Sequence, residues 1–221
     1  MLQPIVYTPP KHNKLDILYQ DQNLIVLNKP AGLLSVPGRG ADKQDCMLSR
    51  LQAEYSDALV IHRLDMPTSG IIMFALNKEM QKAMGHLFEK KLIYKQYLAK
   101  VHGVLEEKKG TINQPLITDW LNRPKQKIDY KNGKVSKTRF TLISTTKDKN
   151  SLVKLEPVTG RSHQLRVHMS SIGHAILGDE LYGTYQSRNQ SSRLLLHAER
   201  ISFIDPLTAL NIDVHCPVDF L

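Results

Sequence analysis

Residues 62–70 stand between two apolar runs and constrain the fold of this chain more than any other segment. The segment reads His-Arg-Leu-Asp-Met-Pro-Thr-Ser-Gly, so a proline, a glycine and two hydroxyl residues favour a turn that leads into a strand. Arg63 and Asp65 are two residues apart, and in extended chain such side chains point the same way. The sequence therefore predicts a cation beside a carboxylate on a tight loop at the edge of a sheet. An ordinary surface ion pair and a functional pair are both compatible with that position.

The chain is strongly basic. Its 30 Lys and Arg outnumber its 21 Asp and Glu, which gives a net charge of +9 and a pI of about 9.5. This balance favours a polyanionic partner, most often nucleic acid, although charge alone is weak evidence. Cys46 and Cys216 are far apart and lack metal-ligand spacing, which indicates a reducing compartment. No apolar run approaches the ~20 residues of a membrane span, and the N-terminus lacks the apolar core of a signal peptide, so we expect a cytoplasmic protein.

Short apolar runs and turn signals predict an α+β fold with a largely antiparallel sheet. A helix is predicted at residues 43–55, with Asp42 as its N-cap. A second is predicted at residues 78–92, where Asn77 can cap the start. A third is predicted within residues 157–173, where a glycine ends it. Strands are predicted at residues 17–19, 24–27, 94–101 and 152–156, and on both sides of the turn signal Asn132-Gly133.

A polar, basic stretch at residues 117–127 surrounds the only tryptophan, Trp120. It is too irregular for a sheet interior and predicts an exposed loop that lies against RNA. Trp120 is either a stacking platform or a side chain that pins the loop to the core. The chain has no linker rich in glycine or serine and no internal repeat, so we expect an irregular arm at residues 1–14 and one domain at residues 15–221.

Several short motifs of polar and glycine residues occur along the chain, and the central one is His-Arg-Leu-Asp-x-x-Thr-Ser-Gly at residues 62–70. The others are Tyr-x-Asp at 19–21, Asn-Lys-Pro-x-Gly-Leu at 28–33, Lys-x-Tyr-x-Ala at 95–99, Gly-Arg-x-His-Gln-Leu-Arg-x-His at 160–168, Ile-x-Gly-Asp at 176–179 and Leu-Leu-His-Ala at 195–198. Together, and in this order, these motifs resemble those of the RluA family of RNA pseudouridine synthases. The His-Arg-Asp loop of protein kinases is a superficial rival, but the glycine-rich phosphate loop and the Asp-Phe-Gly motif are missing.

The resemblance implies a pseudouridine synthase fold, with a mixed, largely antiparallel sheet, flanking helices and a central basic cleft. It makes Asp65 the catalytic residue, Arg166 its ion-pair partner and Tyr97 a residue that lines the active site. We expect Arg166 to hold Asp65 ionised through a bidentate pair. We expect no N-terminal S4 domain of the kind that many family members carry. The cations expected to contact RNA are Lys29, Arg39, Arg63, Arg123, Lys125 and Arg161.

The implied reaction breaks the N1–C1′ bond of uridine, turns the base and joins C5 to C1′. No group is lost, so no cofactor and no metal ion are expected; His163, His168 and His174 lack the spacing of a zinc site. Asp65 would attack C1′, attack C6 or remove a proton from C2′, and the sequence leaves these three open.

The segments at residues 33–39 and 119–127 most resemble the short, dual-specificity member of the family. That likeness implies uridines in a transfer-RNA anticodon loop and in a hairpin of large-subunit ribosomal RNA. We expect the enzyme to be a monomer. A glycoside or nucleoside hydrolase would need a second carboxylate near Asp65. A non-catalytic RNA-binding module would give no reason for a carboxylate in a basic cleft.

Overall fold

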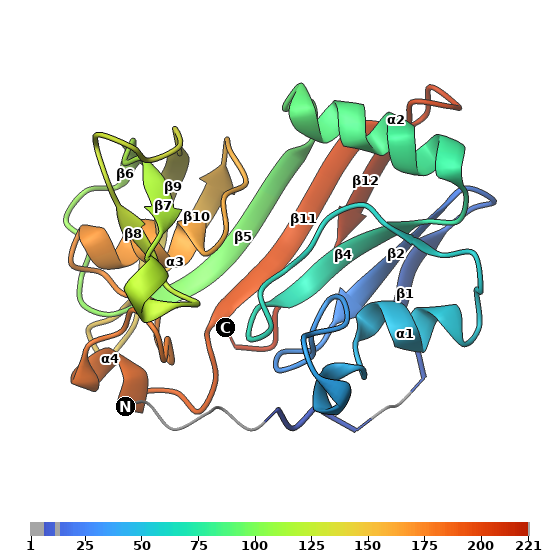
Figure 1. Cartoon of the computed structure of the whole chain (residues 1–221). Helices are drawn as coiled ribbons and strands as arrows, with labels where there is room; N and C mark the ends of the chain where they lie inside the picture. Colours follow the sequence, from blue (N-terminus) through green and yellow to red (C-terminus); the bar gives the residue numbers. More distant parts are fainter. Residues whose placement is uncertain (1–6, 12–13, 221) are drawn as a thin grey trace.

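A ten-stranded mixed sheet runs through the computed structural model, which describes residues 7–11 and 14–220 (Figure 1). Its strands are β1 (Ile17–Gln20), β2 (Leu24–Lys29), β3 (Leu59–Val60), β4 (Ser69–Ala75), β5 (Tyr94–Val101), β6 (Lys109–Ile112), β9 (Thr138–Thr145), β10 (Ser151–Pro157), β11 (Leu196–Ile204) and β12 (Asn211–His215). The order is β1-β2-β4-β11-β5-β10-β9-β6, with β12 beside β11 and β3 beside β4. All these pairs are antiparallel except β4 with β11, which confirms the predicted α+β class with its largely antiparallel sheet.

Helices cover parts of this sheet. They are α1 (Met47–Gln52), α2 (Lys78–Glu89), α3 (Gln164–Ser171) and α4 (Tyr185–Asn189), with short 3-10 turns η1 (Ala41–Lys43) and η2 (Trp120–Asn122). The start of α2 is capped as predicted, because the Asn77 side chain accepts a hydrogen bond from the Met80 amide at 2.8 Å. Met80 and Met84 are buried, so the apolar stripe of α2 packs on the sheet. In the part of the chain that the structure describes, no helix has the length and apolar character needed to cross a membrane.

Among the described residues, two buried clusters form the core. One surrounds β2, β4 and α2, and the other surrounds β10, α3 and the C-terminal half of β5. Tyr97, in the middle of β5, packs against both clusters. In the sheet it lies opposite Ala198 on one side and Leu155 on the other. The centre of β5 therefore joins the two halves of the molecule, which places Tyr97 at their boundary.

The first predicted helix is wrong in its bounds and in its cap. Helix α1 begins at Met47, and Asp42 lies in η1 instead. Its N-cap is Cys46, whose amide donates to the Ser49 hydroxyl at 2.9 Å while the Ser49 amide donates to the Cys46 sulfur at 3.3 Å. This reciprocal arrangement satisfies two amides at the helix start, which an aspartate four residues earlier cannot reach.

The hairpin predicted at Asn132-Gly133 is also wrong. Strand β8 (Gln126–Ile128) pairs with β7 (Leu116–Thr118) as a separate two-stranded sheet, and β9 pairs with β10 and β6. The Asp129 carboxylate accepts the Lys131 and Asn132 amides at 2.9 and 2.8 Å, which closes a wider local turn at residues 129–133. That turn leads the chain from β8 into β9, and the two strands do not pair with each other.

The remaining boundary predictions have mixed outcomes. The predicted strand at residues 94–101 is β5, and the predicted hairpin of residues 17–27 is β1 with β2. Helix α3 starts only at Gln164, after His163 adopts a left-handed backbone with φ 54°. Of the arm predicted at residues 1–14, residues 1–6 and 12–13 lie outside the described residues, and residues 7–11 form neither helix nor strand. The division into an arm and one domain stays a prediction.

Candidate active site

Asp65 lies on the loop before β4, and the start of β4 requires a glycine. Gly70 has φ +101°, and a Cβ there would lie 2.3 Å from the carbonyl oxygen of Ala198 in β11. The glycine therefore allows β4 to approach β11 closely, in the one parallel pair of the sheet. The loop is held further by the Ser35 hydroxyl, which donates to the Leu64 carbonyl at 2.7 Å and accepts from the Leu64 amide at 3.0 Å. Asp65 is thus presented on a rigid loop with 26% of its side chain exposed.

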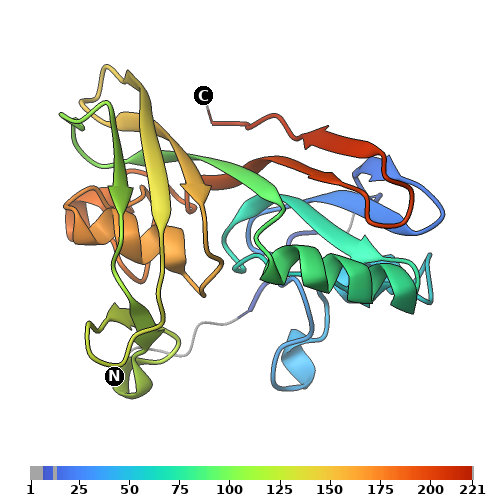
Figure 2. The ribbon, with the colours of Figure 1, turned by 90° about the horizontal axis from the view of Figure 1, so that it is seen from above.

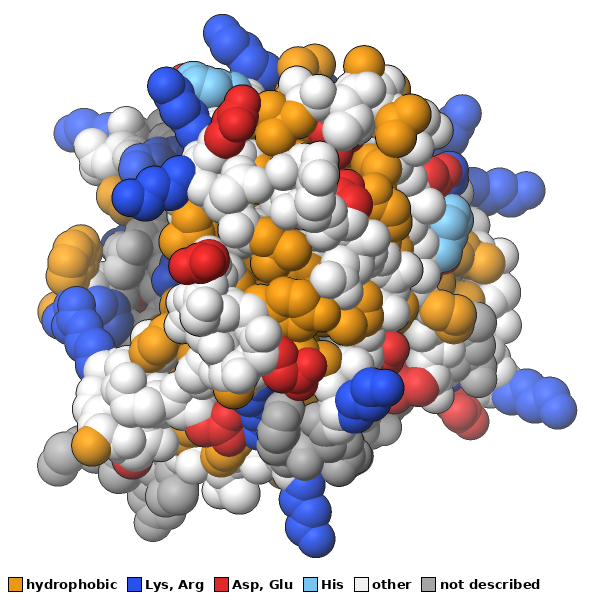
Figure 3. Space-filling view, turned by 90° about the vertical axis from the view of Figure 1, so that its right-hand side faces the viewer, with side chains coloured by type: hydrophobic (Ala, Val, Ile, Leu, Met, Phe, Trp, Pro, Cys, Tyr) orange, Lys and Arg blue, Asp and Glu red, His pale blue; other side chains and the backbone are white. Residues whose placement is uncertain are grey.

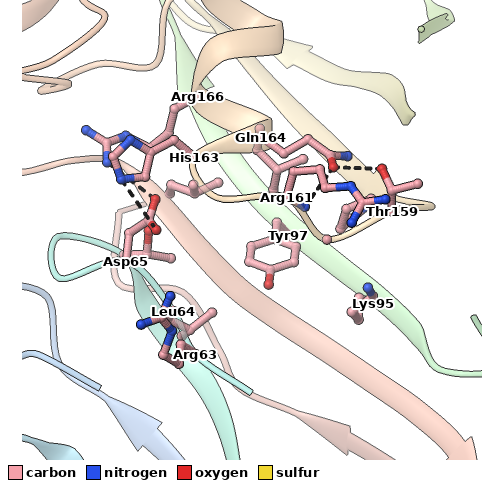
Figure 4. Close-up of a pocket in the computed structure, with 15 residues that line it drawn as sticks. Arg63, Leu64, Asp65, Lys95, Tyr97, Thr159, Arg161, His163, Gln164 and Arg166 are labelled. Carbon is pink, nitrogen blue, oxygen red and sulfur yellow. Dashed lines mark hydrogen bonds and ion pairs between the residues drawn. The ribbon is translucent and has the colours of Figure 1, made fainter. Parts of the chain in front are cut away.

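A pocket opens at Asp65 between three segments of the chain (Figure 4). The Asp65 loop forms one wall, β5 the floor, and the segment from the end of β10 to the start of α3 the opposite wall. The residues that line it are Arg63, Leu64, Asp65, Thr68, Lys95, Tyr97, Pro157, Thr159, Gly160, Arg161, His163, Gln164, Leu165, Arg166 and Leu196. The structure thus brings together Asp65, Tyr97 and Arg166, the three residues predicted to carry the chemistry, and adds Arg63 and Arg161 from the predicted RNA contacts.

Arg166 contacts Asp65, but the predicted bidentate pair is wrong. Its Nη1 lies 3.3 Å from Asp65 Oδ2, a single long contact. The bidentate partner is Asp179, whose two oxygens accept from Arg166 Nε at 2.9 Å and Nη2 at 2.7 Å. The side chains of Arg166 and Asp179 are 3% and 0% exposed. Burial opposes the charge of Arg166, but the hydrogen bonds and charge of Asp179 outweigh it, so the pKa of Arg166 is raised. Asp179 therefore holds the guanidinium, and the remaining Nη1 reaches Asp65.

Asp179 is a functional candidate that the sequence did not single out, although it closes the Ile-x-Gly-Asp motif. Its Oδ1 also accepts the backbone amides of Leu181 and Tyr182, at 2.9 and 3.1 Å. These two hydrogen bonds help to fix the orientation of the Asp179 carboxylate that Arg166 contacts. No local sequence signal indicates that a carboxylate in a turn is fully buried against a helix residue.

Tyr97 stands between the Asp65 loop and Lys95 in the pocket (Figure 4). Burial, together with the charge of Asp65, raises the pKa of its phenol. Burial lowers the pKa of the neighbouring Lys95. Tyr97 is therefore an uncharged phenol at neutral pH, with a ring fixed by both core clusters.

His163 is considered from the sequence only as a zinc ligand, and the structure places it beside Asp65. Its Nε2 lies 3.8 Å from Asp65 Oδ1, and its Nδ1 lies 2.6 Å from the Tyr182 hydroxyl. Burial lowers its pKa, although Asp65 acts in the opposite direction. His168 is instead a satisfied core residue, with its two ring nitrogens near Thr138 Oγ1 and the Gln114 carbonyl, both at 2.9 Å. Across the described residues, no group of three or more His, Cys, Asp or Glu is placed to hold a metal ion.

Lys29 was predicted to contact RNA, and this prediction is wrong because the side chain is fully buried. Its Nζ donates to three backbone carbonyls, those of Pro30, Leu33 and Met66, at 2.9, 2.8 and 3.1 Å. Met66 directly follows Asp65, so this amine ties the Asp65 loop to the loop after β2. A lysine between an asparagine and a proline carries no sequence signal of such burial.

Lys29→Met is expected to destabilise the fold, and by more at high pH. The variant leaves buried carbonyls without a donor, which costs about 1–3 kcal/mol. Burial lowers the pKa of Lys29 from 10.5 to about 7, so the folded state penalises the charged form. The contribution of Lys29 to wild-type stability therefore rises between pH 7 and 10.5, and the deficit of the variant should grow from pH 7 to pH 9.

Urea unfolding at pH 7 and pH 9 measures this difference. Lys43→Met is the matched control, because Lys43 is partly exposed and lies 3.7 Å from Asp42. Its effect should stay within about 0.5 kcal/mol of wild type at both pH values. A deficit for Lys29→Met that is the same at pH 7 and pH 9 would contradict the buried-amine account.

The other predicted RNA contacts lie outside the pocket, on two projections. Arg39 is exposed on the loop that carries η1, and Arg123 and Lys125 lie on the β7–β8 hairpin. Both projections extend from the same side of the sheet (Figure 2). At the hairpin tip, Leu121 is 96% and Trp120 68% exposed, and the Arg123 guanidinium stacks 4.5 Å from the Trp120 ring. Trp120 therefore does not pin the loop to the core.

The end of the molecule formed by β1, β2 and α1 shows a different surface (Figure 3). Hydrophobic side chains gather in the middle of this face, while Lys and Arg side chains stand around its rim. A nucleic-acid backbone requires cations along a continuous track. On the face shown, the cations do not form such a track.

Comparison with known proteins assigns the chain to a family. It belongs to the RNA pseudouridylate synthase family, whose model matches residues 23–171, a span that includes Asp65, Tyr97 and Arg166. Membership makes it an RNA pseudouridine synthase, an isomerase that converts uridine in RNA to pseudouridine.

Individual relatives define its place in the family more closely. The chain is 46% identical over 218 residues to the dual-specificity RNA pseudouridine synthase RluA of Vibrio parahaemolyticus, covering 97% of this chain and 87% of that protein. It is 44% identical over 214 residues to the protein of the same name from Escherichia coli K12, covering 97% and 98%. Among solved structures, human RNA pseudouridylate synthase domain containing 1 superposes with a TM-score of 0.80 at 29% identity, covering 97% of this chain and 87% of that one.

Proposed function

We propose that this enzyme modifies two kinds of RNA, a transfer-RNA anticodon loop and a hairpin of large-subunit ribosomal RNA. The observation that carries the proposal is the near-complete coverage of relatives named as dual-specificity enzymes, at 44–46% identity. The exposed, basic hairpin tip with its tryptophan supports it, because stacking and phosphate contacts tolerate different sequences. We further propose a cytoplasmic monomer that needs neither a metal ion nor a cofactor, since isomerisation adds and removes no group.

The roles proposed for the pocket follow from its geometry. A uridine in a stack cannot reach Asp65, so the base turns out of the RNA, at a cost of a few kcal/mol. Asp65 then acts at the sugar–base junction by attack on C1′ or C6, or by removing a proton from C2′. Arg166 orients the carboxylate through its 3.3 Å contact. The uncharged Tyr97 stacks on the base and relays the C5 proton, and Arg63, exposed at the pocket, binds the flanking phosphate or fills the vacated space.

Hydrolysis is the rival chemistry. A glycoside or nucleoside hydrolase needs a second available carboxylate. Asp179 belongs to the same network, but it is fully buried and both of its oxygens accept from Arg166. The geometry therefore favours isomerisation over release of uracil.

Mapping of pseudouridines in total RNA, with and without this protein, tests the proposal. Dual specificity predicts that one signal in transfer RNA and one in large-subunit ribosomal RNA disappear together when the gene is removed. Both signals should return with the wild-type gene. A signal that disappears from only one RNA class would reduce the proposal to single specificity, and release of free uracil in vitro would favour the hydrolase.

The hairpin cations are expected to set RNA affinity and its salt dependence. Arg123→Ala with Lys125→Ala should weaken binding of an anticodon stem-loop, because fewer phosphates are neutralised and fewer counterions are released. The slope of log affinity against log salt should become shallower by about 0.7–0.9 for each phosphate that the variant no longer neutralises. Fluorescence anisotropy at salt concentrations from about 50 to 200 mM measures this slope. Lys147→Ala, an exposed cation in the turn between β9 and β10, is the control, and an equal change in that variant would contradict the assignment.

A further inference from the structure

Within the described residues, the hydrogen bond between the β7–β8 hairpin and the catalytic half of the molecule is made by one side-chain hydroxyl. The amide of Gln126 in β8 donates to the hydroxyl of Tyr182 at 2.7 Å. The other hydrogen bonds of residues 116–133 in the described chain stay within residues 115–134. Among these hydrogen bonds, the one to Tyr182 is therefore the one through which a shift of the hairpin acts on the rest of the molecule.

Tyr182 contacts three groups of the Asp65 network. Its hydroxyl lies 2.6 Å from His163 Nδ1, and the two rings meet edge to face at 5.6 Å. The Arg166 guanidinium stacks over its ring at 5.2 Å. Its own amide donates to Asp179 Oδ1 at 3.1 Å. The ring is therefore fixed by the groups that hold Asp65, while its hydroxyl reaches out to the hairpin.

The direction of donation along these hydrogen bonds follows from the first donor, the Gln126 amide. A backbone N–H can only donate, so the Tyr182 oxygen accepts from Gln126 and has its own hydrogen to give. Burial raises the pKa of Tyr182 to about 12, so that hydrogen is present at neutral pH. His163 Nδ1 then accepts it, which leaves the proton of the neutral imidazole on Nε2, the atom 3.8 Å from Asp65 Oδ1.

We propose that Tyr182 is a positioning residue that couples RNA docking on the β7–β8 hairpin to the orientation of His163, and through His163 to Asp65. Bound RNA holds the hairpin, the Gln126 amide fixes the Tyr182 hydroxyl, and the hydroxyl selects the His163 tautomer that directs an N–H at the catalytic carboxylate. When an RNA binds the pocket but not the hairpin, the hydrogen bonds from Gln126 through Tyr182 do not fix the His163 tautomer. The inference rests on the proposed function, because it assigns RNA to the hairpin and catalysis to Asp65.

Tyr182→Phe removes the hydroxyl and keeps the ring that stacks on Arg166. In steady-state assays with an anticodon stem-loop, we expect kcat to fall about tenfold while RNA affinity stays within about twofold of wild type. Tyr55→Phe is the matched control, because it removes a hydroxyl that donates to Gln20 at 3.0 Å, away from the pocket. A wild-type kcat for Tyr182→Phe, or an affinity loss equal to the loss in kcat, would overturn the proposal.

A double-mutant cycle with Trp120→Ala separates coupling from a local defect. In the wild-type background, Trp120→Ala should lower both RNA affinity and kcat, because the hairpin no longer holds its position. In the Tyr182→Phe background it should lower affinity alone, since the link to His163 is already cut. The same fold-loss of kcat in both backgrounds would overturn the proposal.

The His163 tautomer gives a readout that a merely structural role of Tyr182 would not move. In protein with ¹⁵N-labelled histidine, imidazole nitrogen shifts should report a proton on Nε2 of His163 in the wild type and a mixture of tautomers in Tyr182→Phe. His163→Gln identifies the signal by its loss. An unchanged tautomer in Tyr182→Phe would refute the proposed chain, whereas an inactive wild-type enzyme would instead refute the proposed function.

Discussion

Asp65→Asn is expected to abolish pseudouridine formation while RNA affinity stays within about twofold of wild type. The amide keeps the shape of the carboxylate but cannot supply a negative charge or a nucleophilic oxygen at the sugar–base junction. Loss of a group that acts in the transition state costs about 10⁴-fold or more in kcat. Binding should persist, because the phosphate-facing cations are untouched and a carboxylate in a basic site repels RNA. Chromatography of digested nucleosides measures product, and anisotropy measures affinity.

A loss of activity in Asp65→Asn supports a catalytic role only if the fold of the variant is unchanged. Asp65 is only partly buried and makes one long contact to Arg166, so the thermal midpoint of Asp65→Asn should lie close to that of wild type. Equal losses of RNA binding and turnover would count against the catalytic role of Asp65.

Arg166→Met is expected to lower both stability and activity. Methionine leaves Asp179 as a buried carboxylate without its bidentate partner, which costs about 3–5 kcal/mol. It also removes the Nη1 that faces Asp65, and activity should fall about 10²- to 10³-fold, the range for loss of one preorganised donor. Urea unfolding and single-turnover kinetics measure the two effects.

A second substitution separates these effects. Arg166→Met with Asp179→Asn removes the stranded charge and keeps an acceptor for the Leu181 and Tyr182 amides, so stability should recover by a few kcal/mol. Activity should not recover, because Asp65 still lacks its guanidinium. Recovery of activity with stability would show that Arg166 only supports the fold, and unchanged activity in Arg166→Met would remove its assigned role.

The sequence predicted those parts of the fold whose signals are local. Strand β5 is rich in aromatic and β-branched residues, and its bounds are those predicted. Helix α2 follows a clear apolar period after Asn77, and its start is confirmed, although it ends at Glu89 before the predicted residue 92. The Asn132-Gly133 prediction failed because Asp129 holds a competing local turn that no dipeptide signal describes.

The sequence predicted the central residues of the candidate site and the contact between Arg166 and Asp65, but not the geometry of that contact. The motifs shared with the synthase family predicted Asp65, Tyr97 and Arg166, and the structure brings these three residues into one pocket. Burial and long-range pairing decided the rest. A lysine is expected at the surface, but the Lys29 side chain is 0% exposed. The bidentate partner of Arg166 is Asp179, in a turn after α3.

The catalytic role of Asp65 on an extruded uridine is tested most directly by single-turnover release of tritium from RNA labelled at uridine C5. Joining C5 to C1′ displaces the C5 hydrogen, so we expect one tritium released for each pseudouridine formed by wild type. With Asp65→Asn at saturating enzyme, we expect bound RNA and no release. Tritium release by Asp65→Asn at a rate near that of wild type, or free uracil in place of pseudouridine, would contradict it.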